Sequence, residues 1–152
     1  MNYTNLDAID IKILQILSMN GRESYIEIGK KVNLSRVSVK ARIDSMVESG
    51  IIESFSVIIN PEKTGQSVSV FLDIDVSPQY LYEVSNKLNE IEFITDIYHM
   101  TGNTKLHVHA LFSNKDVLSE FLENKLYKMD GIIKVNCEMI VSRIKCRRGI
   151  RP

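Results

Sequence analysis

The chain has 152 residues, 44% of them hydrophobic, and a formal net charge of zero from 19 Lys and Arg against 19 Asp and Glu. This composition is typical of one globular domain or two small ones, and no apolar run approaches the ~18 residues that a membrane span needs. The N-terminus lacks the features of a secretory signal. Cys137 and Cys146 show neither a disulfide framework nor a metal-ligand spacing, so we expect reduced thiols in a cytoplasmic protein.

The first predicted element is a helix, because apolar residues recur with helical spacing from Leu6 to Leu17. Asp7 and Asp10 lie near its start, where the helix dipole favours negative charge. Asn20-Gly21 is expected to end it.

Two shorter helices joined by a tight turn are predicted next. Ser24 and Glu27 have the spacing of a capping box at the start of the first. Asn33 tolerates the left-handed conformation that a tight turn requires. Ser35 is the expected N-cap of the second helix, which ends before Gly50. Apolar residues with helical spacing in these two helices, expected to complete a three-helix core, are Ile28, Val32, Val39, Ile43, Met46 and Val47.

Positive charge is concentrated on this helix pair, with five cations and no carboxylate between Lys30 and Arg42. A charge run alone is most often a solvated face. Combined with the caps, the turn and the apolar spacing, it indicates a helix-turn-helix that binds DNA phosphates.

The run 51–60 is rich in β-branched and aromatic residues and predicts a strand that acts as a hinge. Asn60-Pro61 and Gly65 then mark a boundary. We therefore expect a DNA-binding domain at 1–50, a hinge at 51–65 and a second domain at 66–152.

The second domain has the pattern strand, helix, strand, strand, helix, strand, which predicts a ferredoxin-like βαββαβ fold. Alternating or β-rich runs predict strands at Val68–Val76, Phe93–Met100, Lys105–Phe112 and Ile132–Val141. Ser77-Pro78 and Asn114 are expected to begin the two helices. The fold class is therefore α+β, with a three-helix winged-type helix-turn-helix in front.

Both helices of such a fold cover the same face of the sheet. The opposite face is expected to carry Phe71, Tyr98, Met100, Leu111 and Ile140. That much apolar surface is unusual on a monomer, so we expect a second copy to cover it in a two-fold dimer.

The joint order of several short motifs resembles the Lrp/AsnC (feast/famine) transcription regulators over nearly the whole chain. The motifs are Leu6-Asp7 with Asp10 and Ile13-Leu14, Asn20-Gly21-Arg22, Leu34-Ser35, Val39 with Arg42-Ile43, Gly50-Ile51-Ile52, Asn60-Pro61 and Thr101-Gly102. The resemblance implies operator binding with autoregulation, and a dimer built through RAM-type C-terminal domains, often as tetramers or octamers.

The resemblance also implies an amino-acid effector near the turn Thr101, Gly102, Asn103, Thr104 and Lys105. The family places an acidic residue about three positions after the glycine, where this chain has Lys105. A lysine would repel an effector's ammonium group. We therefore expect a changed effector, for example one with additional negative charge, or no response to amino acids.

Seven residues are predicted to contact DNA: Lys31, Ser35, Arg36, Val37, Ser38, Lys40 and Arg42. Arg36 and Lys40 are expected to reach base edges, because guanine offers them two acceptors. Val37 would touch a thymine methyl, and Ser38 a base or a phosphate. The remaining three would contact phosphates. For Arg42 an internal salt bridge near Asp44 or Glu48 is an equal alternative.

The three histidines do not predict a metal site. His107 and His109 share one face of their strand, whereas His99 should pair opposite Leu106 and point to the other face. Two histidines on one face without a third ligand are weak evidence for a zinc site. On a sheet face that meets a dimer partner, we expect them to make dimerisation sensitive to pH.

No phosphate-binding glycine loop, cofactor motif or nucleophile motif is present, so we expect a protein that is not an enzyme and needs no cofactor. Two other functions remain open: a metabolite-binding module whose front domain mediates protein contacts, and a DNA-organising protein of low sequence specificity. The basic residues of 143–151 add nonspecific DNA attraction, contact an acidic patch or form a solvated terminus.

Overall fold

The computed structural model describes residues 6–102, 104–142 and 144. They form two compact units, one reaching to Ile58 and the other spanning Ile59–Ile144. No helix within the described ranges is long and apolar enough to cross a membrane. The basic C-terminal stretch apart from Ile144, and Asn103 of the predicted effector turn, lie outside the described residues.

The front unit is the predicted three-helix bundle, with α1 (Ala8–Met19), α2 (Tyr25–Val32) and α3 (Arg36–Glu48). The start of α1 is stabilised by a reciprocal capping box between Asp7 and Asp10. The sequence predicted only that these two carboxylates favour the positive end of the helix dipole. The buried core residues are Ile13, Ile28, Val32, Val39, Ile43 and Met46. Val47, predicted to face inward, is 42% exposed, so the apolar stripe of α3 is narrower than expected.

The turn between α2 and α3 has the geometry of a helix-turn-helix. Asn33 adopts the predicted left-handed conformation with φ 56° and ψ 45°. Gly29 makes the close packing possible, because a Cβ atom there would lie 2.5 Å from the carbonyl oxygen of Leu34. The predicted capping box at Ser24 forms only in part. Ser24 accepts a hydrogen bond from the Glu27 N–H, while the Glu27 carboxylate pairs with Lys30.

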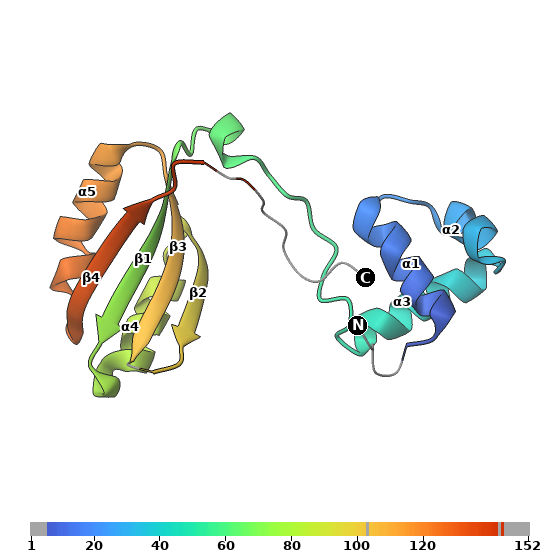
Figure 1. Cartoon of the computed structure of the whole chain (residues 1–152), viewed down its shortest axis with the longest axis horizontal. Helices are drawn as coiled ribbons and strands as arrows, with labels where there is room; N and C mark the ends of the chain where they lie inside the picture. The colour runs from blue at the N-terminus through green and yellow to red at the C-terminus, as the bar shows by residue number, and fades with distance from the viewer. Residues whose placement is uncertain (1–5, 103, 143, 145–152) are drawn as a thin grey trace. The chain divides into compact units, whose positions relative to one another are not determined.

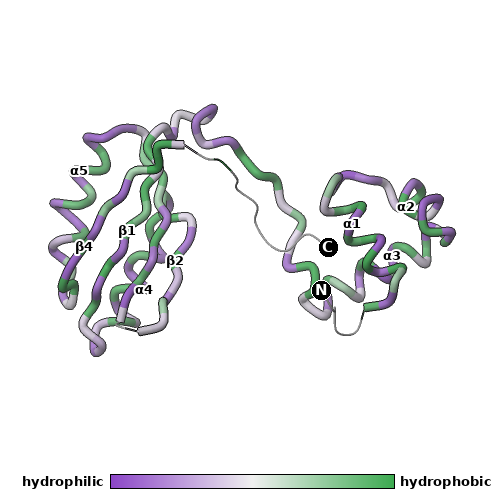
Figure 2. The backbone as a smooth tube through the Cα atoms, viewed as in Figure 1, coloured by the Kyte–Doolittle hydropathy of each residue, from purple (hydrophilic) through white to green (hydrophobic). Residues whose placement is uncertain are grey.

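The strand predicted at 51–60 is not formed. Residues 53–60 have no regular structure, and Figure 2 shows hydrophobic colour along part of the segment that joins the two units. Phe55, Val57, Ile58 and Ile59 are between 55% and 81% exposed. A β-rich run becomes a strand only when a neighbouring strand accepts its backbone hydrogen bonds, and the described chain supplies none here.

The back unit is the predicted βαββαβ sandwich. Its strands β1 (Val68–Val76), β2 (Ile94–Met100), β3 (Lys105–Phe112) and β4 (Ile132–Met139) form an antiparallel sheet in the order β2-β3-β1-β4. Helices α4 (Leu81–Asn89) and α5 (Lys115–Asn124) pack on one face of this sheet (Figure 1). The residues of α4, α5, β1 and β3 buried between these layers are Leu81, Val84, Leu88, Leu118, Phe121, Val70, Leu72, Ile74, Val76, Leu106, Val108, Ala110 and Phe112.

The alternation of the run 132–141 predicts Ile133 on the core face of its strand, and a bulge in β4 shows this to be wrong. Asp75 pairs with Lys134 but Val76 pairs with Ile132, so the register skips Ile133. Ile132 therefore packs against the core and Ile133 is 70% exposed. Cys137 is half-buried against the core, and burial raises the pKa of its thiol.

The face opposite the helices is open and mixed in character. Phe71, Tyr98 and Met100 are 37%, 54% and 45% exposed there, as the alternation predicts. His107 and His109 lie beside them on β3. The register pairs His99 with Leu106, so the predicted separation of His99 from the other histidines is confirmed.

Candidate nucleic-acid interface

Helix α3 has one side buried in the bundle and an opposite side exposed to solvent. Val39, Ile43 and Met46 point into the bundle, so Arg36, Val37 and Lys40 are exposed on the other side. Val37 is 76% exposed, which is unusual for a valine in a folded domain and leaves its methyl groups free to contact a ligand. This side has the chemistry of a recognition helix: two cations beside a small apolar group.

The start of α3 is held by a serine cap. The Ser35 side chain accepts a hydrogen bond from the Ser38 N–H at 3.1 Å, and the two hydroxyl oxygens lie 2.9 Å apart. Both hydroxyls therefore lie at the N-terminal end of the helix, where the dipole favours an anion such as a DNA phosphate.

Four of the five cations in the basic stretch have acidic partners that lie outside it in sequence. Lys30 contacts Glu27 at 2.6 Å, and Lys31 contacts Glu23 at 3.2 Å. Lys40 is bound to Asp44, which raises the pKa of the lysine. The charge excess predicted from the sequence is therefore largely neutralised in the folded unit.

Arg42 makes the most extensive of these contacts. Its Nη1 donates to a carboxylate oxygen of Asp7 and to one of Asp10, each at 2.7 Å, and so ties the start of α1 to α3. These partners differ from the predicted neighbourhood of Asp44 and Glu48. Hydrogen bonds to Asp10 and Asp7 raise the pKa of Arg42, and bonds from the Asp10 backbone and from Arg42 lower the pKa of Asp7.

Arg36 is the exception among the five cations: it forms no ion pair with any described residue. It is the first residue of α3 and is exposed. An unpaired guanidinium at this position can bind guanine or phosphate without first breaking an internal contact.

The predicted effector turn borders a hollow of about 400 Å³ on the open face of the sheet. Thr101 and Lys105 line it together with Asp73, Met100 and His107. The Thr104 carbonyl accepts a hydrogen bond from the Val76 N–H at the end of β1. The structure therefore brings two of the five predicted effector residues to one cavity.

Charges of both signs surround this hollow. Lys105 Nζ lies 3.8 Å from Asp75 Oδ1, a buried oxygen that has no hydrogen-bond partner in the described part of the chain. Asp73 Oδ1 lies 2.7 Å from His107 Nδ1. An acidic side chain is thus present beside the lysine, although it comes from β1 rather than from the turn.

A polar network crosses the same sheet face. His109 Nε2 lies 2.8 Å from the Ser69 hydroxyl, and His109 Nδ1 lies 2.7 Å from that of Thr95. The Phe71 ring lies against both histidines: it stacks on His107 at a centroid distance of 4.9 Å and meets His109 in a tilted arrangement at 5.0 Å. The two histidines are thus components of this face, as predicted.

Comparison with known proteins identifies both units. Residues 6–47 match the AsnC-type helix-turn-helix domain, and residues 69–150 match the Lrp/AsnC ligand binding domain. The chain belongs to the Lrp/AsnC family. It is 34% identical over 140 residues to the HTH-type transcriptional regulator LrpA of Pyrococcus horikoshii, covering 92% of this chain and 99% of that protein.

Solved structures of the family have the same fold. Escherichia coli AsnC has a TM-score of 0.89 at 26% identity, over 97% of this chain and 99% of that one. A transcriptional regulator of Neisseria meningitidis, solved as a complex with L-Met, also has a TM-score of 0.89, at 22% identity over 96% of each chain. This Lrp/AsnC protein is therefore an HTH-type transcriptional regulator and not an enzyme.

Sequence reasoning missed two features of the interface. The first is Gly29, whose close approach to Leu34 could have been suspected from a glycine inside an otherwise good helix. The second is the pairing of Lys31 with Glu23 and of Arg42 with Asp7 and Asp10, partners that lie up to 35 positions away along the chain and carry no local signal.

Proposed function

We propose that this Lrp/AsnC protein binds pseudo-palindromic operators as a two-fold dimer, that it represses or activates its own gene among others, and that it acts in the cytoplasm. The observation that carries the proposal is the exposed side of α3, with an unpaired Arg36 at the start of the helix. In a dimer two such helices lie a fixed distance apart and reach successive major grooves.

The contacts within each half-site follow from exposure and pairing. Arg36 contacts a base edge. Lys40 also contacts a base edge, after its ion pair with Asp44 has broken. Val37 packs on a thymine methyl, whereas Ser35, Ser38 and Lys31 bind the phosphate backbone. Arg42 has a different role, because the carboxylates of Asp7 and Asp10 hold it against the start of α1 and it positions α3 there.

The open face of the sheet is the proposed dimer interface. Phe71, Tyr98 and Met100 supply its apolar contacts, and the histidine network supplies polar ones. A two-fold axis through this face brings the same patch of both copies together, which is the commonest way to bury such a surface. Further assembly into tetramers or octamers would use surfaces outside this face.

The hollow at Thr101 and Lys105 is the proposed effector site. The related Neisseria protein was solved with L-Met, so an amino-acid-like ligand is the starting point. Here Lys105 would bind the ligand's carboxylate, and Asp73 would bind its ammonium group. A ligand with a second carboxylate fits this arrangement best, because Lys105 and His107 both line the hollow.

The test is binding of the full chain to the DNA upstream of its own gene, by fluorescence anisotropy at two salt concentrations, against a shuffled duplex. We expect Arg36→Ala to lose most of the discrimination between the duplexes while keeping the wild-type unfolding midpoint. Arg42→Ala should do the reverse, with a lower unfolding midpoint and preserved discrimination.

Wild-type discrimination in Arg36→Ala would reject the assignment of the recognition helix. A DNA-organising protein would bind both duplexes with similar affinity, so the specific-to-nonspecific ratio of the wild-type chain separates that function from a dedicated regulator.

A further inference from the structure

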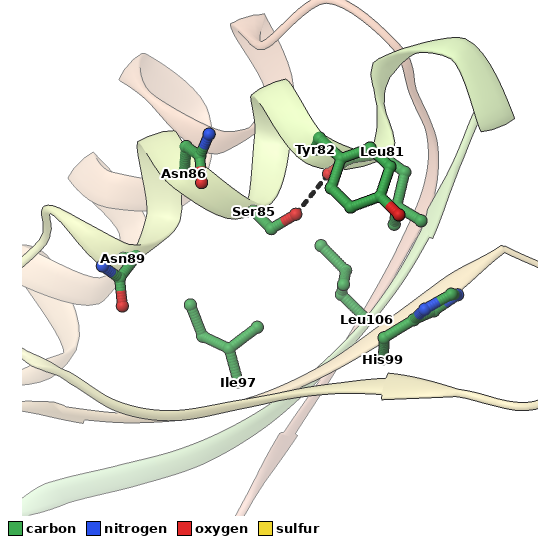
Figure 3. A pocket seen from close by; sticks show the side chains of 8 residues that line it. All are labelled: Leu81, Tyr82, Ser85, Asn86, Asn89, Ile97, His99 and Leu106. Atoms are coloured by element: carbon green, nitrogen blue, oxygen red, sulfur yellow. Dashed lines mark hydrogen bonds between the residues drawn. The ribbon is translucent and has the colours of Figure 1, made fainter.

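A second cavity lies on the opposite face of the sheet from the hollow at Thr101. It is a groove of about 290 Å³ between α4 and the strands β2 and β3 (Figure 3). Leu81 and Leu106 form a buried apolar floor, with Ile97 beside them. The groove is separate from the first hollow. Met100, Lys105 and His107, which line the hollow, are the sequence neighbours of His99 and Leu106, and neighbouring residues of a strand point to opposite faces of the sheet.

Two aromatic rings stand at one end of the groove. Tyr82 comes from α4 and His99 from β2, so the rings belong to opposite walls (Figure 3). Both side chains are exposed, and neither makes a hydrogen bond to another residue that the structure describes. A planar ligand between these walls can stack on both rings.

Two amides line the helix side of the groove. Asn86 and Asn89 lie three residues apart on α4 and therefore on one side of it. No hydrogen bond joins either amide to the described part of the chain, whereas the nearby Ser85 hydroxyl already donates to the Leu81 carbonyl. The amides are thus available as donors and acceptors for a ligand.

The groove is uncharged although α4 is not. No Asp, Glu, Lys or Arg lines it, and the adjacent Lys87 and Glu83 pair with each other at 2.7 Å. A zwitterionic amino acid or a phosphate would bring charges that find no opposite partner among the residues that line the groove. The chemistry favours a neutral ligand.

We propose that this groove binds a neutral adenine-type base or its nucleoside. The purine would stack on Tyr82 and His99, and an asparagine amide would pair with its N6 and N7 atoms, as asparagine does with adenine in DNA. The volume is near the lower end for ligand sites, about 300 Å³, which suits a small ligand. This is a ligand site additional to the proposed effector hollow and independent of DNA binding.

Isothermal titration of the full chain with adenosine, AMP, inosine and leucine tests the proposal. We expect saturable adenosine binding, weaker inosine binding because inosine lacks the N6 amino group, and no tighter binding of AMP. The double variant Asn86→Ala/Asn89→Ala should weaken adenosine binding at least tenfold. The matched control Asn124→Ala removes an exposed amide from α5 and should bind like the wild type. Arg36→Ala should also bind adenosine normally, which excludes a base bound at the DNA interface.

Three results would overturn the assignment: no saturable adenosine binding, adenosine affinity unchanged in the double variant, or AMP or leucine binding tenfold more tightly than adenosine. Ile97→Trp, which fills the groove without removing an amide, provides a second variant if the first unfolds. Operator affinity measured without nucleoside should be unchanged in the double variant. A failure of the regulator function and a failure of the groove assignment therefore give different results.

Discussion

The pairing of Lys40 with Asp44 predicts that removing one carboxylate will strengthen DNA binding. Both side chains lie on the exposed side of α3, and Asp44 holds the lysine through an i,i+4 contact. Asp44→Asn keeps the shape of the side chain and leaves Lys40 without its partner. It therefore adds one unpaired cation per subunit to the surface that faces DNA.

The expected magnitude follows from counterion release. The logarithm of affinity falls with the logarithm of salt with a slope of about −0.9 for each phosphate neutralised. Removing the two Asp44 carboxylates of the proposed dimer changes the charge of the DNA-facing surface by as much as two neutralised phosphates would, and should steepen the slope by about 1.8. Between about 50 and 200 mM salt the variant should then lose about tenfold more affinity than the wild type, starting from tighter binding.

Anisotropy titrations of a labelled operator duplex across this salt range measure the slope directly. Glu83→Gln is the matched control, because it removes the carboxylate of the Lys87–Glu83 i,i+4 pair on α4 and changes the net charge by the same amount. We expect the control to keep the wild-type slope. Equal slopes for Asp44→Asn and the wild type would refute the placement of Lys40 against DNA. A steeper slope in the Glu83→Gln control would show that total charge, not the α3 surface, sets salt dependence.

Three further predictions concern the packing, the assembly and the pH dependence of the chain. Gly29→Ala should destabilise the front unit by about 1–3 kcal/mol, because its Cβ would lie 2.5 Å from the Leu34 carbonyl oxygen. Gly21→Ala, with no atom nearer than 3.8 Å, should have little effect in the same denaturant titration. Phe71→Asp should convert the proposed dimer to monomers in sedimentation equilibrium, and a variant that remains dimeric would exclude this face as its interface. The lowered pKa of Asp7 stabilises the fold above the ordinary aspartate value of about 4 and ceases to do so as pH falls through the lowered value. The stability difference between the wild type and Asp7→Asn should therefore shrink below pH 4, and a constant difference would contradict this account.

The basic stretch also shows why a count of cations along the sequence overestimates the unpaired positive charge of the folded unit. Between Lys30 and Arg42 the chain contains cations only. Folding brings Glu23 against Lys31, and Asp7 and Asp10 against Arg42. A window of neighbouring residues does not detect these partners. Lys40 is different, because its partner Asp44 lies four positions along α3, a spacing that already indicates a pair. Of the five cations of this stretch, Arg36 alone has no acidic partner to exchange in the described structure.

The hinge and the last strand are the other places where local pattern and structure differ. The apolar run ending at Ile59 has strand propensity but no strand beside it in the described chain, and propensity alone does not satisfy backbone groups. Ile133 and Ile132 look equally apolar, and the bulge opposite Val76 decides which of them reaches the core. Register is a property of two strands, so one strand's sequence does not specify it.

The sequence by itself determined the order of the elements, the helix-turn-helix with its Ser35 cap and left-handed Asn33, the βαββαβ pattern and the family. These features depend on residues within a few positions of one another, whose spacing and caps act locally. Only the tertiary structure decided which cations are neutralised, how close Gly29 lies to the turn, and which side chains line the two cavities. Those features are contacts between residues distant in the chain, and they exist only once the elements have packed.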